Sequence, residues 1–199
     1  MCIRDSTLLK GALSESGGSY YARAGALLPM LPASQRAPFA GFAAREGILS
    51  ADAMVDLYSD IYADSAAEGD PAAHAAGLRE AYLAADPAAR IAAMRRLWAA
   101  GPALGGGDGY GARVLTAYAA ARIPADAAHA DNAGELIAAM LAAGLDRNAA
   151  RWAGVVEDGS LGWGLIALAV PREGSVGQGA VSSFISSDAS EGSRKSAFL

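Results

Sequence analysis

The densest group of side chains able to ligate a metal lies in a polar stretch of the second half of the chain. It consists of Asp126, His129, Asp131 and Glu135. A helical turn would bring Asp126 and His129 to one face, as in the metal sites of helical bundles. Such a site needs a second pair from another helix, and His74 is the only other histidine. The pattern therefore favours a solvated connector whose carboxylates begin helices.

A second group of carboxylates, Asp52, Asp56, Asp60 and Asp64, recurs at every fourth residue. On a helix this spacing gathers the four side chains on one broad face. Like charges at this spacing cost an isolated helix a few tenths of a kcal/mol. The series is consistent with a face that binds cations or a basic partner, although a plain solvated surface also accounts for it. We expect the first three to be exposed and Asp64 to lie nearer the apolar face.

Other patterns of catalytic or cofactor chemistry are missing from the sequence. The glycine-rich residues 105–111 precede a predicted helix, but no strand comes before them and no Gly-Lys-Ser/Thr follows. Neither the dinucleotide pattern nor the phosphate-loop pattern is met, so we predict a flexible connector. No Gly-x-Ser-x-Gly motif is present. We therefore predict no catalytic residue and no cofactor, and the sequence gives no positive reason to expect an enzyme.

Composition places the chain among globular helical proteins. Of its 199 residues, 53% are hydrophobic and 19% are charged, as expected for one domain or two small ones. Alanine, the best helix former, makes up about a quarter of the residues. The net charge is −5, which argues against nucleic-acid binding because that function needs a basic surface.

The first six residues, Met1–Ser6, resemble the in-frame translation of a transposon-end adapter used in sequencing libraries. We treat them as foreign to the fold and expect them to pack against nothing. The single cysteine, Cys2, would then not be native. We interpret residues 7–199 as one α-helical domain, read from bacterial environmental DNA and cut at both ends.

Capping residues, prolines and glycines divide the chain into nine or ten short helices. We expect them at 20–28, 37–47, 51–63, 70–84, 86–101, 112–122, 133–143, 146–156, 161–170 and 177–186. Ser50, Asp70, Asn132 and Asp146 are the predicted caps of four of them. Tyr62 and Leu83 fall on the faces predicted to be buried.

The helix at 86–101 carries the clearest signals. Asp86 can cap it, Pro87 suits its first position, and Gly101 can end it in the left-handed conformation. Between these residues an apolar stripe recurs at helical spacing: Ile91, Met94, Leu97 and Trp98. We expect Trp98 to be an anchor of the core.

The segment 161–170 is almost wholly apolar. Its roughly ten residues are too few for a bilayer, which needs about 20. We therefore predict a buried helix and no transmembrane segment.

Together these patterns predict an all-α fold of antiparallel helical hairpins. The residues 86–94 and 132–140 share a capping residue followed by Ile-Ala-Ala-Met, at a period that suits the two-helix unit of an α-solenoid. Such folds mostly bind proteins or peptides, so a non-enzymatic scaffold or interaction module is the first interpretation. The alternatives are a helical domain of a larger enzyme, such as a cell-envelope hydrolase, and a bundle that binds a small ligand or a metal.

Overall fold

The structure is a computed structural model that describes residues 24–101, 109–171 and 176–187. Met1–Ser6 and residues 20–23 of the predicted helix at 20–28 lie outside the described residues, and residues 24–27 of that helix are helical. Within the described ranges helices are joined by turns and loops, and no strand is present. The all-α prediction is therefore confirmed. The helices are α3 (Ala33–Arg45), α4 (Ala51–Ala63), α5 (Gly69–Leu83), α6 (Pro87–Ala99), α7 (Tyr110–Ala121), η2 (Ala127–Asn132), α8 (Ala133–Ala142), α9 (Asp146–Ala150), α10 (Leu161–Ala169) and α11 (Gln178–Ser186).

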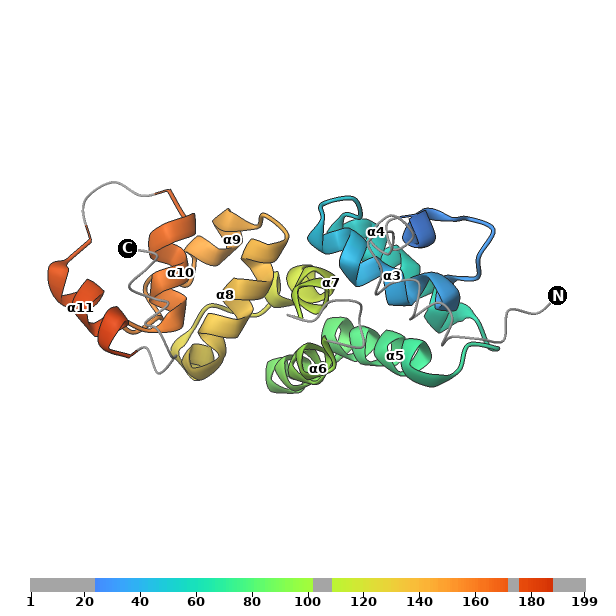
Figure 1. Cartoon of the computed structure of the whole chain (residues 1–199). Helices are drawn as coiled ribbons and strands as arrows, with labels where there is room; N and C mark the ends of the chain where they lie inside the picture. Colours follow the sequence, from blue (N-terminus) through green and yellow to red (C-terminus); the bar gives the residue numbers. More distant parts are fainter. Residues whose placement is uncertain (1–23, 102–108, 172–175, 188–199) are drawn as a thin grey trace.

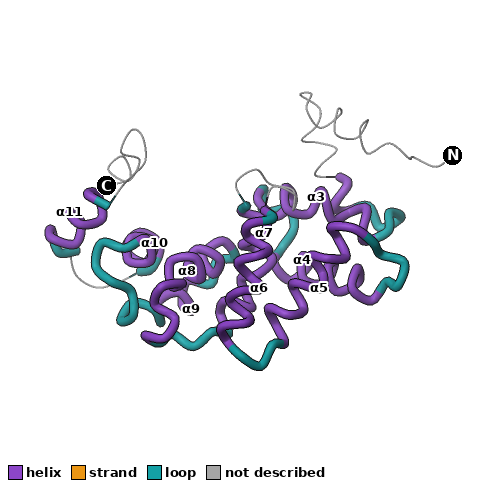
Figure 2. Tube along the Cα trace, turned by 90° about the horizontal axis from the view of Figure 1, so that it is seen from below, coloured by secondary structure: helices purple, strands orange, loops and turns teal. Residues whose placement is uncertain are grey.

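Neighbours in sequence are also neighbours in space, because the connections are short. Each helix from α3 to α8 packs against the next one along the chain. Helix α7 occupies the centre of the elongated molecule with α6 packed beside it, α3 to α5 lie on one side, and α8 to α11 lie on the other (Figures 1 and 2). It contacts α3, α4, α5 and α6 as well as α8.

The helices enclose two main hydrophobic cores, and α7 contributes to both. Met54 and Tyr58 of α4 lie in the first core, together with Leu115 of α7. The second core contains Met94 of α6 and the fully buried Trp152, and α7 adds alanines at its other end. Small side chains let helices approach closely. At the crossing of α3 and α7, a Cβ on Gly111 would lie 2.5 Å from the Cα of Gly41.

Several predicted helix signals are confirmed. The Ser50 hydroxyl accepts a hydrogen bond from the Ala53 amide at 3.2 Å and caps α4. The Asp86 carboxylate accepts from the Ala88 amide at 3.0 Å and caps α6. These acceptors satisfy amides that have no partner within their own helix.

Two of the predicted cap positions are wrong, and a third is only partly confirmed. Asp70 and Asp146 lie inside α5 and α9, whose N-cap residues are Glu68 and Leu145. Asn132 is the N-cap residue of α8 as predicted, but it has helical dihedrals and its side chain accepts no hydrogen bond from an amide of that helix. The reason is that η2 leads directly into α8, so the chain is already helical at Asn132.

The predicted role of Gly101 is also wrong. It is not among the glycines with positive φ. Instead, a Cβ at Gly101 would lie 2.6 Å from the Cα of Gly109. Glycine is therefore needed there for close approach of two backbone segments rather than for a left-handed turn.

Two helix ends differ from the prediction. Helix α3 begins at Ala33 rather than 37 and contains Pro38 in its second turn. Helix α9 ends at Ala150, because the chain then continues in tighter turns. In these turns the Trp152 amide bonds to the carbonyl of Ala149, and the Ala153 amide bonds to that of Ala150.

Some apolar residues predicted to face inward are exposed. Tyr62 is 50% exposed and Leu83 is 60% exposed. Helix α10 is half-covered rather than buried, since it packs against α8 on one side and exposes Leu161 and Leu168 on the other. No helix in the described ranges is long and apolar enough to cross a membrane.

Trp98 joins the two cores instead of lying within one. It is half-buried and packs against both clusters of buried residues. Its indole Nε1 donates a hydrogen bond to the Thr116 hydroxyl of α7 at 2.8 Å. The predicted anchor is therefore a bridge from α6 to α7.

Candidate functional site

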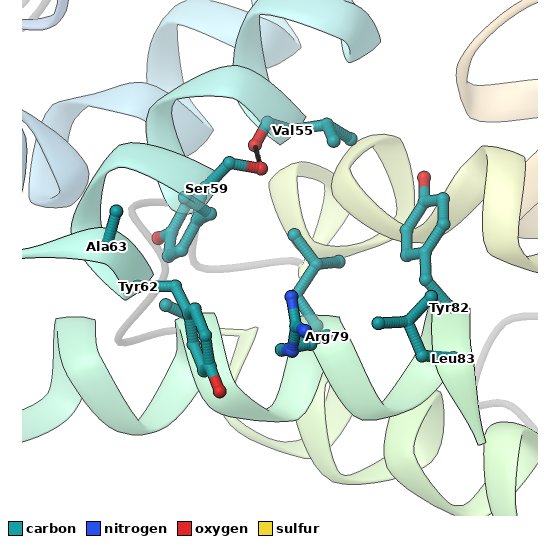
Figure 3. A pocket seen from close by; sticks show the side chains of 10 residues that line it. Val55, Ser59, Tyr62, Ala63, Arg79, Tyr82 and Leu83 are labelled. Carbon is teal, nitrogen blue, oxygen red and sulfur yellow. Dashed lines mark hydrogen bonds between the residues drawn. The ribbon is translucent and has the colours of Figure 1, made fainter.

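A groove lies between α4 and α5, with a cavity volume of about 370 Å³. We call it the α4–α5 groove. Figure 3 shows the side chains of both helices that line it. The apolar and aromatic lining includes Val55, Tyr58, Tyr62, Leu78, Tyr82 and Leu83.

The groove exists because small residues stand where the two helices could otherwise fill the space. Ala63 of α4 and Ala75 of α5 both line it. Alanine buries little area, and Tyr62 and Leu83 at the groove remain 50% and 60% exposed. The result is an apolar surface open to solvent, of the kind found at binding sites.

Polar groups at the groove are few, and Ser59 and Arg79 are already engaged. The Ser59 hydroxyl donates to the Val55 carbonyl at 2.8 Å, as Figure 3 shows. The Arg79 guanidinium lies over the ring of Tyr62, 4.8 Å from its centroid. That distance allows a cation–π interaction.

The two buried tyrosines at the groove, Tyr58 and Tyr82, stay neutral at physiological pH. Burial raises the pKa of Tyr82 to about 12, with a smaller contribution from Tyr118 nearby. Its hydroxyl lies next to the Ala119 backbone but finds no hydrogen-bond partner of ordinary geometry in the described chain. Burial also raises the pKa of Tyr58. The lining therefore provides apolar contact and no general base.

The acidic face of α4 runs beside the groove. Asp52, Asp56 and Asp60 are exposed as predicted. Burial raises the pKa of the Tyr118 phenol, and the negative charge of the nearby Asp52 carboxylate adds to this shift. Asp64 differs from the prediction. It lies just past the end of α4 and is exposed to solvent rather than turned toward the apolar face. There its carboxylate accepts from the Ala66 amide at 2.9 Å.

A smaller polar hollow of about 220 Å³ lies on the other side of α4. Asp56 and Asp60 line it together with Arg36 of α3. The Arg36 Nε atom is buried and has no hydrogen-bond partner in the part of the chain that is described. Asp56 thus lies on α4 between this hollow and the α4–α5 groove.

The other predicted ligand group is spread over several structural roles. The Asp126 carboxylate accepts from the Ala128 amide and caps η2. His129 is half-buried, Asp131 is exposed, and Glu135 forms an ion pair with Arg95 at 3.2 Å. The described residues include no group of three or more His, Cys, Asp or Glu side chains placed to hold a metal ion.

The glycine-rich connector is only partly described, since residues 105–108 lie outside the described ranges. Gly109 adopts the left-handed conformation, with φ of 71°, directly before α7. Gly111 provides the close contact with α3. These two glycines therefore position α7, which the prediction of a flexible connector did not foresee.

Comparison with known proteins adds no resemblance to this geometry. No protein-family model matches the chain, and neither a curated protein nor a solved structure matches it. The function is therefore argued from the residues and the structure alone.

Proposed function

We propose that this protein is a non-enzymatic interaction module, and that its α4–α5 groove binds an apolar segment of a protein partner. The observation that carries the proposal is the exposure of Tyr62 and Leu83 at an apolar groove. Tyrosine and arginine are enriched at binding hot spots, and Arg79 stacked on Tyr62 supplies both at one place. A partner would cover surface that now faces water.

The proposal suits a peptide or protein segment better than a small ligand. Small-molecule sites combine an enclosed apolar pocket with a few polar groups that fix orientation. Here the Ser59 hydroxyl is already bonded to Val55, and Tyr62 and Leu83 make the rim apolar. The domain of a larger enzyme and the α-solenoid remain proposals that the groove neither requires nor opposes.

The experiment is a selection of displayed peptides of about 15 residues, long enough to form an isolated helix. The bound peptides are then measured against two double variants. Tyr62→Ser/Leu83→Ser removes the exposed apolar groups of the groove. Leu161→Ser/Leu168→Ser is the matched control, because these leucines of α10 are also about half exposed.

We expect selected peptides to carry apolar residues at helical spacing and to lose about tenfold or more in affinity for the groove variant, which corresponds to 1.4 kcal/mol. The control variant should bind them as the wild type does. Peptides that bind both variants equally well would show that the groove is not the binding site.

A further inference from the structure

We propose that the partner segment is a basic amphipathic helix, which places its apolar side in the α4–α5 groove and its Lys or Arg side chains along the acidic face of α4. This inference rests on the proposed function and adds the chemistry of the partner. Three features support it: the charge of residues 51–83, the distribution of that charge across the groove, and the length of the groove.

The charge of the protein is concentrated where the groove lies. Residues 51–83 contain seven Asp or Glu and a single Arg, so this stretch has a net charge of −6 when His74 is neutral. The whole chain has a net charge of −5. Helices α4 and α5 themselves hold five of these carboxylates and the arginine, a net charge of −4, and the other two carboxylates lie in the loop between them. Such a field attracts cationic partners and repels anionic ones.

The charge is also unequal on the two sides of the groove. Around the axis of α4, Asp52 lies within about 20° of the groove-lining Ser59, and Asp56 lies about 60° away. On the α5 side, the only base among the described lining residues is Arg79, held over Tyr62. A bound helix would therefore turn its basic flank toward α4 and keep it away from Arg79.

The length of the groove suits a short helix. Its lining on α4 runs from Val55 to Ala63, which spans about 12 Å, or roughly two helical turns. Apolar residues at positions i, i+3, i+4 and i+7 of a helix cover this length, as in other helix-in-groove complexes. A second copy of this chain fits less well, because two surfaces of net negative charge would repel each other.

The test compares two synthetic helical peptides that share one leucine face. One carries only lysine on its polar face and the other only glutamate. Their dissociation constants for the full chain are measured by fluorescence anisotropy at low and high salt. Two charge-reversed variants are measured alongside: Asp52→Lys/Asp56→Lys on α4, the carboxylates nearest the groove, and Glu157→Lys/Asp158→Lys in the turn before α10. Both change the net charge equally, and all four residues are exposed.

We expect the lysine peptide to bind about tenfold or more tightly than the glutamate peptide at low salt, and the preference to shrink at high salt because the charges are screened. The α4 reversal should reduce the preference below about threefold, whereas the control reversal should leave it near the wild-type value. Equal loss in both variants would show that net charge alone is responsible, and this result would overturn the inference.

The Tyr62→Ser/Leu83→Ser variant separates this inference from the proposed function. If the two peptides bind equally and both lose affinity for that variant, the groove is a docking site but the basic partner is wrong. If neither peptide loses affinity for that variant, or neither binds, the proposed function and the inference fall together. Circular dichroism of each variant verifies that it is folded.

Discussion

At the residue scale, the hydrogen bond from Trp98 to Thr116 joins α6 to the central helix α7. Thr116 is fully buried, and its hydroxyl also donates to the Ala112 carbonyl at 2.9 Å. The hydroxyl thus accepts from one helix and donates within its own. A buried hydroxyl that loses a partner costs about 1–3 kcal/mol.

Thr116→Val tests this bond with little change of volume. We expect it to lower the free energy of unfolding by about 1–3 kcal/mol in the wild type, because Trp98 Nε1 loses its acceptor. In a Trp98→Phe background the same substitution should cost about 1 kcal/mol less, since the donor is already absent. Urea denaturation of the four proteins measures the coupling. Equal costs in the two backgrounds would show that the bond contributes nothing.

His74 provides a pH dependence of stability. Burial lowers its pKa from 6.5, and nearby Asp70 opposes the shift. Below pH 6.5 the unfolded chain therefore binds a proton more readily than the folded chain. The stability contributed by neutral His74 is complete above pH 6.5 and is lost as the pH falls through the lower folded pKa.

The measurement is the melting temperature at pH 7.5 and at pH 5.5. The wild type should fall further between these values than His74→Gln, which has no imidazole to protonate at this site. His129→Gln is the matched control because it removes the other histidine and keeps His74, so the part of the fall that depends on His74 should remain. A fall in His74→Gln equal to that of the wild type would contradict the assignment.

At the element scale, glycine acts differently in two helices. Gly111 of α7 meets the Gly41 backbone, so a Cβ there would lie 2.5 Å from a Cα. Gly77 of α5 has its nearest neighbour at 3.4 Å, the Cδ2 atom of a leucine side chain. Alanine therefore has room at the second position and not at the first.

Gly77→Ala should raise the free energy of unfolding by about 0.4–1 kcal/mol, because alanine loses less backbone entropy in a helix. Gly111→Ala should lower it by more than about 1 kcal/mol, since α3 and α7 must move apart. Thermal or urea unfolding gives both values. Stabilisation by Gly111→Ala would mean that the two helices are not packed at backbone distance.

Sequence predicts the elements of this fold better than it predicts their contacts. Ser50 and Asp86 act over three residues or fewer, so their capping can be recognised without the fold. The exposure of Tyr62 and Leu83 could not be foreseen, because it depends on how α4 and α5 cross. Helical spacing placed both on apolar faces, but alanines at the crossing left those faces uncovered.

The same limit applies to the candidate site. The spacing of Asp52, Asp56 and Asp60 predicted a solvent-exposed acidic face, since it needs only one helix. The groove beside that face combines two helices and carries no motif. One signal was the alanine content of α4 and α5, because Ala63 and Ala75 at the groove leave the ring of Tyr62 50% exposed.

At the scale of the whole molecule, α7 joins two cores and leaves the α4–α5 pair at one end of an elongated shape (Figure 1). The groove is thus placed where a partner can reach it without disturbing the second core. Negative charge is concentrated on the same pair of helices, so apolar contact and electrostatic attraction would act at one surface. The proposed binding of a basic helix rests on this combination of an apolar groove and negative charge at one surface.

The most direct test is a map of amide chemical shifts of the full chain, labelled with ¹⁵N and titrated with the leucine–lysine peptide. The account predicts that the largest changes cluster at the groove, at Val55, Ser59, Tyr62, Arg79 and Leu83, with smaller changes along the acidic face of α4. Changes centred instead on α10, around Leu161 and Leu168, or spread evenly over the acidic surface, would contradict it.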